Sequence, residues 1–191
     1  MPQILFINAC VRPESRTLRL ARHILDRLDG TVETLDLQRE QIPPLDNATL
    51  EYRIARLEAG RTDDPLFAYA RQFAAADEIV IAAPYWDLSF PASLKTYIEA
   101  INVLGITFDF DERGVAHGRC RARRLIYVTT AGGPILDDQL GYGYIQTLCR
   151  SFYGIPETLY VKAEGLDVIG APVESLLTAA AQEADRLLGI S

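Results

Sequence analysis

The transition at residues 4–17 constrains this chain most, because an apolar run gives way there to a polar loop and then to a helical pattern. Residues 4–7 are Ile-Leu-Phe-Ile, and apolar residues recur at helical spacing directly after Thr17. A strand that leads through a loop into a helix directs backbone N–H groups at one point, where the helix dipole adds partial positive charge. The sequence therefore predicts a phosphate site in this loop.

The predicted phosphate loop contains no glycine, so it carries neither the G-x-G-x-x-G nor the G-x-x-x-x-G-K-[ST] fingerprint. We therefore expect the hydroxyl groups of Ser15 and Thr17 to act together with main-chain donors. The alternative is that Ser15 is only a helix N-cap and Thr17 an ordinary residue of the first turn. The missing fingerprint also argues against a Rossmann dehydrogenase.

Strand-like and helical patterns alternate along the whole chain. The expected strands cover residues 4–7, 32–37, 78–83, 125–130 and 158–163, and the expected helices cover about 18–28, 49–59, 65–76, 91–105, 138–152 and 172–188. Gly30 is expected to be a left-handed residue at the end of the first helix, and Asp64 to cap the third. Residues 107–118 form an excursion with a turn at 111–114.

Five buried strands separated by helices are joined only by right-handed crossovers. The pattern predicts an α/β fold: a doubly wound, five-stranded parallel sheet of order 2-1-3-4-5 with helices on both faces. Nothing repeats and no low-complexity linker divides the chain, so we expect residues 1–191 to form a single domain.

The composition favours a soluble cytoplasmic protein, since 49% of the residues are hydrophobic but no stretch is apolar enough to span a bilayer and no secretory signal is visible. Cys10, Cys120 and Cys149 lie far apart, which suits reduced thiols. The two histidines, His23 and His117, are too few for a histidine-rich metal site, and we expect no metal. A net charge of −7 argues against non-specific binding to nucleic acid or to an anionic membrane, and the lack of a long apolar stretch argues against membrane insertion.

Ligands of a sheet with this strand order bind beyond the carboxyl ends of the first and third strands, where the winding reverses. The loop after the third expected strand offers the flat apolar side chains of Tyr85 and Trp86, which suit one face of a planar tricyclic ring. The loop after the fourth contains Gly132 and Gly133, whose N–H groups suit the polar N1/O2 edge of such a ring.

Each of these loops also has an ordinary interpretation. Tyr85 and Trp86 are compatible with aromatic core residues at a strand end, and a Gly-Gly-Pro sequence is common in turns. Three loops at one edge of the sheet, each suited to a different part of the same molecule, together favour a flavin nucleotide.

The same residues carry a resemblance to a known family. The matching segments are residues 15–17, Ile42-Pro43-Pro44-Leu45-Asp46, residues 82–88, Leu94-Lys95-Thr96-Tyr97, residues 105–108, residues 129–133 and Ala163-Glu164-Gly165. In their order and spacing the chain resembles the flavodoxin-like NAD(P)H dehydrogenase (quinone) family, most closely its FMN-dependent NADH:quinone oxidoreductase and azoreductase branch.

The resemblance implies a set of cofactor-binding residues around FMN. They are Cys10, Ser15, Arg16 and Thr17 at the phosphate, Pro84, Tyr85, Trp86, Asp87 and Leu88 along the ribityl chain and ring, and Thr130, Ala131, Gly132 and Gly133 at the pyrimidine end. The family often has serine in place of Cys10 and asparagine in place of Asp87. Asp87 would therefore present an acceptor, or a proton-dependent donor, near the reactive edge of the ring, with Tyr142 as a second tuning residue.

Family members are typically homodimers in which the partner completes the active site. The resemblance thus makes Phe108, Tyr142 and Phe152 candidates for a substrate wall, although all three are also ordinary packing residues.

The leading hypothesis is an FMN-dependent enzyme that takes a hydride from NADH or NADPH and passes two electrons to a quinone-type or azo acceptor by ping-pong kinetics. No side chain need act as a nucleophile in such chemistry. FAD is the alternative cofactor. The alternative functions are a flavodoxin-type electron carrier and a flavin-binding regulatory protein without turnover.

Overall fold

The computed structural model describes residues 1–190. Its strands are β1 (Gln3–Asn8), β2 (Thr31–Asp36), β3 (Glu78–Ala82), β4 (Phe108–Phe110), β5 (Ala116–Gly118), β6 (Arg124–Thr130) and β7 (Glu157–Ala163). Its α-helices are α1 (Arg16–Leu25), α2 (Leu37–Glu40), α3 (Asn47–Glu58), α4 (Ala68–Ala75), α5 (Ala92–Ile101), α6 (Tyr142–Leu148) and α7 (Val173–Leu187). Shorter helical segments are η1 (Pro65–Phe67), η2 (Asp138–Leu140) and η3 (Cys149–Tyr153).

The main sheet has the order β2-β1-β3-β6-β7, and every neighbouring pair in it is parallel. This arrangement confirms the expected order 2-1-3-4-5, with β6 and β7 as the fourth and fifth strands. All residues of the central strand β3 are buried, as a strand covered on both faces requires.

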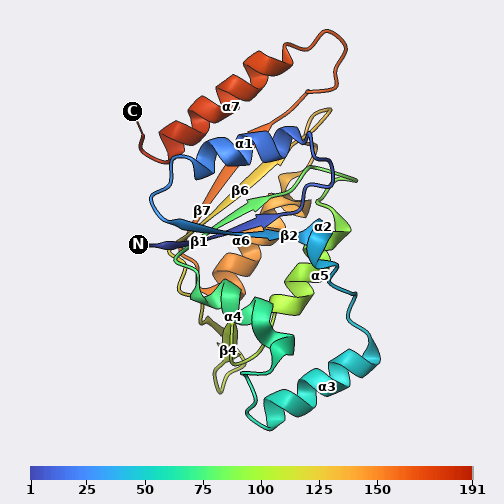
Figure 1. Cartoon of the computed structure of the whole chain (residues 1–191), viewed down its shortest axis with the longest axis vertical. Helices are drawn as coiled ribbons and strands as arrows, with labels where there is room; N and C mark the ends of the chain where they lie inside the picture. The colour runs from blue at the N-terminus through green and yellow to red at the C-terminus, as the bar shows by residue number, and fades with distance from the viewer. Residues whose placement is uncertain (191) are drawn as a thin grey trace.

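Alternate residues of each strand supply two cores, one on each face of the sheet. Ile79 and Ile81 of β3 belong to the core beneath α4, α5 and α6, whereas Val80 and Ala82 belong to the core beneath α1 and α7. Figure 1 shows α1 and α7 on one face of the sheet and α4, α5 and α6 on the other. No helix in residues 1–190 is long and apolar enough to cross a membrane.

The first helix is shorter than expected, and the role predicted for Gly30 is wrong. Helix α1 ends at Leu25, with Asp26 as its C-cap, and Gly30 is absent from the glycines with positive φ. A Cβ atom at Gly30 would lie 2.7 Å from the carbonyl oxygen of Pro2. Gly30 is therefore needed for close approach of two chain segments rather than for a left-handed turn.

Local hydrogen bonds explain the other differences in element bounds. The Asp36 carboxylate accepts from Gln38 N, so β2 ends there and α2 begins at Leu37. Asp64 caps the next segment by accepting from Leu66 N, as expected, but this segment starts with η1 before α4. The single helix expected over residues 138–152 is divided into η2, α6 and η3.

The excursion at residues 107–118 is an antiparallel hairpin of β4 and β5. The carboxylate of Asp111 accepts hydrogen bonds from Arg113 N at 2.9 Å and Val115 N at 2.8 Å, which fixes the turn. The hairpin precedes β6, so it lies at the amino end of the sheet, next to η3, which precedes β7.

Several carboxylates that hold turns and caps make the stability of the fold dependent on pH. The pKa of Asp77 is lowered by the hydrogen bond from Gln3 N and by Arg121, and those of Asp46 and Asp64 are lowered by hydrogen bonds at their caps. A carboxyl group with a lowered folded-state pKa stabilises the fold above its unfolded pKa, and this contribution is lost as the pH falls through the folded value. We expect thermal unfolding at pH 3 to begin at a lower temperature than at pH 7, and Asp77→Asn to reduce the difference. Equal midpoints for the unsubstituted chain at both pH values would contradict this expectation.

Candidate functional site

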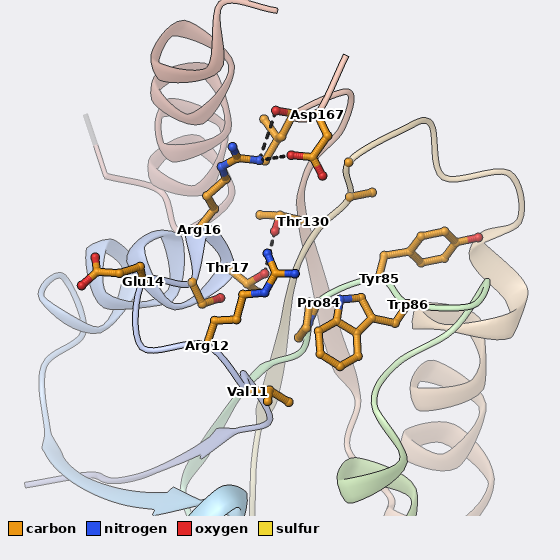
Figure 2. Close-up of a pocket in the computed structure, with 14 residues that line it drawn as sticks. Val11, Arg12, Glu14, Arg16, Thr17, Pro84, Tyr85, Trp86, Thr130 and Asp167 are labelled. Carbon is orange, nitrogen blue, oxygen red and sulfur yellow. Dashed lines mark hydrogen bonds and ion pairs between the residues drawn. The ribbon is translucent and has the colours of Figure 1, made fainter. Parts of the chain in front are cut away.

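A pocket of about 400 Å³ lies at the carboxyl edge of the main sheet, where the loops after β1, β3, β6 and β7 meet (Figure 2). It is lined by Val11, Arg12, Glu14, Ser15, Arg16, Thr17, Pro84, Tyr85, Trp86, Thr130, Ala131, Gly132, Leu166 and Asp167. Its volume falls within the range of small-molecule sites. It lies beside β1 and β3, where the winding of the sheet reverses.

The N-terminus of α1 forms one end of the pocket. Ser15 is the N-cap, and its Oγ accepts from Leu18 N at 3.3 Å. The remaining first-turn N–H groups of α1 have no acceptors within the helix and add to its positive dipole end. Thr17 is fully buried, and its hydroxyl is 2.6 Å from that of Thr130. Ser15 is thus a helix N-cap, as the alternative interpretation of the sequence predicted, and Ser15 and Thr17 also both line the pocket.

Arg16 joins this end of the pocket to the loop between β7 and α7. Its guanidinium donates to the carbonyl oxygen of Leu166 at 3.1 Å and to the Asp167 carboxylate at 2.7 Å. Asp167 N in turn donates to the carbonyl oxygen of Gly132 at 2.8 Å. Figure 2 shows Arg16 and Asp167 facing each other at the pocket rim. The loop after β7 is therefore fastened both to α1 and to the loop after β6.

The loop after β3 makes a tight turn that presents aromatic surface to the pocket. Trp86 and Ser89 exchange two backbone hydrogen bonds, at 3.0 and 2.8 Å. The two residues between them, Asp87 and Leu88, have φ values of 50° and 67°. Left-handed conformations cost non-glycine residues free energy and gather at functional sites. Trp86 is 40% exposed, so part of its indole ring is available to a ligand.

Gly132 lies where the loops after β6 and β7 touch. A Cβ atom there would lie 2.3 Å from an oxygen of the Asp167 carboxylate, so a larger residue would displace that side chain. Gly133 accepts a hydrogen bond from Gly165 N at 3.1 Å and has open space around its Cα.

Four of the expected cofactor residues adjoin the pocket without lining it: Cys10, Asp87, Leu88 and Gly133. The thiol of Cys10 is buried and lies 3.7 Å from the carbonyl oxygen of Ala82, beneath the loop. The other nine, from Ser15 to Gly132, lie on the pocket wall. Their roles toward a cofactor stay predictions.

The three residues suggested for a substrate wall lie elsewhere in the chain. The rings of Phe108 and Phe152 meet at 4.8 Å, next to Phe110, at the amino end of the sheet. Tyr142 stacks on Tyr160 at 4.3 Å on the sheet face. One chain therefore does not bring these three residues to its own pocket.

Five residues of the pocket wall were missed by sequence reasoning: Val11, Arg12, Glu14, Leu166 and Asp167. The first three belong to the loop already identified after β1. Leu166 and Asp167 follow β7, and the rule that ligands lie beyond carboxyl ends applies to that strand as well.

The cysteines of the chain are expected to be unreactive in the folded state. Burial raises the pKa of the Cys10 thiol to about 11 and those of Cys120 and Cys149 to about 12, so little thiolate is present at pH 8. We expect Ellman's reagent to modify almost no thiol of the native protein at pH 8 and all 3 cysteines after unfolding in guanidinium chloride. Rapid modification of Cys10 in the native state would contradict this view of the loop.

The chemistry of the pocket wall fits a ligand with an anionic tail and a flat ring. Amide and hydroxyl donors gather at one end, around Ser15 and Thr17, and the half-exposed indole of Trp86 lies across the pocket from them. Across residues 1–190 no cluster of three metal-ligating side chains accompanies them.

Comparison with known proteins agrees with the fold. The model of a family described as having a flavodoxin-like fold matches residues 2–188. An FMN-dependent NADH:quinone oxidoreductase 2 of Clostridium acetobutylicum is 36% identical over 189 residues, and the match covers 93% of each chain. An FMN-dependent NADH:quinone oxidoreductase of Coprothermobacter proteolyticus is 33% identical, with 98% of each chain covered.

Solved structures show the same fold at lower sequence identity. The crystal structure of an azoreductase from Bacillus anthracis superposes with a TM-score of 0.83 at 24% identity and covers 98% of each chain. That of an FMN-dependent NADH-azoreductase from the same organism, in complex with FMN, gives a TM-score of 0.79 at 22% identity and covers 98% of this chain and 99% of that one.

Proposed function

The chain belongs to the family with the flavodoxin-like fold, and from this premise we propose that it is an FMN-dependent NAD(P)H oxidoreductase that reduces quinone-type and azo acceptors. The observation that carries the proposal is one pocket at the N-terminus of α1 to which the loops after β1, β3 and β6 all contribute. Each of these loops brings the chemistry that one part of FMN requires.

The phosphate end of the pocket is well suited to an anion. The free N–H groups in the first turn of α1, together with the hydroxyls of Ser15 and Thr17, would hold the FMN phosphate. A hydrogen bond between the hydroxyls of Thr130 and Thr17 fixes the position of Thr17. These residues bind and orient the cofactor.

The remaining two loops would hold the ring. Trp86 offers a flat surface. The two backbone hydrogen bonds of the turn join Trp86 and Ser89, so the backbone N–H groups of Asp87 and Leu88 take no part in them. At the other end, Gly132 and Gly133 allow the main chain to approach the pyrimidine edge closely. When bound, FMN supplies the two-electron hydride chemistry that no side chain of this chain provides.

Asp87 is proposed to tune the site. Its carboxyl group is exposed on the same tight turn, and it accepts a hydrogen bond when ionised and donates one when protonated. A change in the reduction rate on replacement of Asp87 by asparagine would support this role. Tyr142 lies on the sheet face, bonded to Thr158, so any influence it has on the pocket is indirect.

We propose that two copies of the chain form the active unit. Phe108 and Phe152 lie at the amino end of the sheet and the pocket at its carboxyl end, so a partner is needed to bring these rings to a pocket. Phe110 of the same cluster is 52% exposed and available for such a contact. Sedimentation equilibrium that gives the mass of one chain, 21.2 kDa, would contradict the homodimer.

The single domain of residues 1–191 and a cytoplasmic location complete the proposal. They rest on the continuous alternation of strands and helices and on the reduced cysteines.

Steady-state turnover tests the proposed function. The FMN-loaded protein is expected to oxidise NADH or NADPH continuously with menadione as acceptor. Double-reciprocal plots of the initial rate against the concentration of NADH or NADPH, made at several menadione concentrations, should be parallel because both substrates use one slot in turn. A flavodoxin-type carrier would show no turnover without a separate reductase. A flavin-binding regulatory protein would bind FMN yet fail with every acceptor, and either result would refute the enzyme.

A further inference from the structure

Two guanidinium groups line the phosphate end of the pocket, and their surroundings differ. Arg16 is engaged by the Asp167 carboxylate and by the carbonyl oxygen of Leu166. Arg12 is exposed, and within residues 1–190 it makes neither an ion pair nor a side-chain hydrogen bond. Only Arg12 therefore has all its donors available to a ligand.

The direction of the side chains matches this difference in partners. Figure 2 shows Arg12 extending into the pocket between the start of α1 and Pro84, whereas Arg16 points toward Asp167. Glu14, the other acidic residue of the wall, points away from the pocket. The positive charge of Arg16 is balanced by Asp167, while that of Arg12 is not balanced by any contacting carboxylate.

Neighbouring contacts hold Arg16 in its place. Leu166 N and Asp167 N donate to the carbonyl oxygens of Ala131 and Gly132, at 3.2 and 2.8 Å. The Asp167 carboxylate also packs directly over Gly132, where even a methyl group would collide with it. If Arg16 turned to a ligand, it would leave the Asp167 carboxylate unpaired beside an anion, which is unfavourable.

On the assignment of the pocket to FMN, we propose that Arg12, not Arg16, is the cation that binds the phosphate group. Arg16 is a positioning residue: with Asp167 it fastens the loop after β7 to α1 and so closes the end of the pocket. The planar guanidinium of Arg12 matches a phosphate monoester, which offers two oxygens to parallel N–H donors. Riboflavin, which lacks the phosphate, gains nothing from Arg12.

Comparing these two ligands across variants tests the assignment. Dissociation constants of FMN and riboflavin for the flavin-free full-length chain are measured from the quenching of flavin fluorescence. Arg12→Gln should reduce the preference for FMN over riboflavin by about 10-fold or more, the effect of one charge-assisted hydrogen bond, and leave riboflavin affinity unchanged. Arg16→Gln should weaken both ligands by a similar factor and preserve the preference.

Arg22→Gln serves as the matched control, because Arg22 is an exposed arginine on α1, the helix that also carries Arg16, and does not line the pocket. It should change neither constant. Thermal melts of all three variants establish that each is folded.

The outcomes separate this inference from the proposed function. If the unsubstituted chain prefers FMN and Arg12→Gln retains that preference, the assignment of Arg12 is overturned while the FMN site stands. If Arg16→Gln alone removes the preference, Arg16 is the phosphate ligand. Failure of the unsubstituted chain to bind FMN at all would instead refute the proposed function.

Discussion

Removal of FMN is expected to abolish NADH-dependent reduction of menadione, and added FMN is expected to restore it. No amino-acid side chain accepts a hydride from a nicotinamide, so the hydride acceptor must come from the cofactor. The measurement is the rate of NADH oxidation, followed at its nicotinamide absorbance, before and after the flavin is stripped by acid ammonium sulfate.

Two controls make the result decisive. The stripped protein must retain the far-ultraviolet circular dichroism of the loaded protein, so that lost activity is not lost structure. Riboflavin, added at a concentration at which FMN saturates the protein, should restore little activity because it lacks the phosphate held at the N-terminus of α1. A stripped protein that keeps its full rate would refute the cofactor assignment.

The largest effect on stability is expected for Gly118→Ala. A Cβ atom at Gly118, the last residue of β5, would lie 2.1 Å from backbone atoms of Tyr153 and Gly154, so one of the two backbone segments would have to shift. Overpacking of this kind costs about 1–3 kcal/mol. The loss should appear as a lower urea midpoint with an unchanged slope.

Gly133→Ala is the matched control for this substitution. Gly133 has no heavy atom within 4 Å of the position a Cβ would take, and its φ is not positive. We expect its stability to change by less than about 0.5 kcal/mol. If Gly118→Ala were equally mild, the close packing of the β4–β5 hairpin on η3 would be wrong.

The centre of the sheet could be predicted from the sequence because its central strands β1, β3 and β6 are buried on both faces. The apolar runs at residues 4–7 and 79–83 have no polar face, which is the pattern of central parallel strands, and both strands form in the structure. The bounds of the helices could not be predicted in the same way, because they depend on individual contacts that hydrophobic periodicity does not reveal. Gly30 is an example, since the carbonyl oxygen of Pro2 that excludes a side chain there is distant in sequence.

The pocket was predictable to the extent that its residues follow strands. Strand ends located Ser15, Trp86 and Gly132, because parallel strands deliver their following loops to one edge. The partners of those residues were not predictable. The pairing of Arg16 with Asp167 joins residues 151 positions apart, and nothing in the local sequence distinguishes Arg16 from Arg12.

The placement of Phe108 and Phe152 shows a different limit. The family resemblance suggested both for a substrate wall, but the direction of α5 and α6 carries the chain back to the amino end of the sheet before either residue is reached. Their distance from the pocket in one chain follows from this topology, and a role for them depends on a second copy.

The central claim is that the pocket at the N-terminus of α1 holds FMN, and a crystal structure of the protein with FMN tests it most directly. We expect electron density for the phosphate at the first-turn amides of α1, beside Ser15, Thr17 and Arg12, and for the ring against Trp86. Density for FMN at another surface, with this pocket filled only by solvent, would contradict the claim.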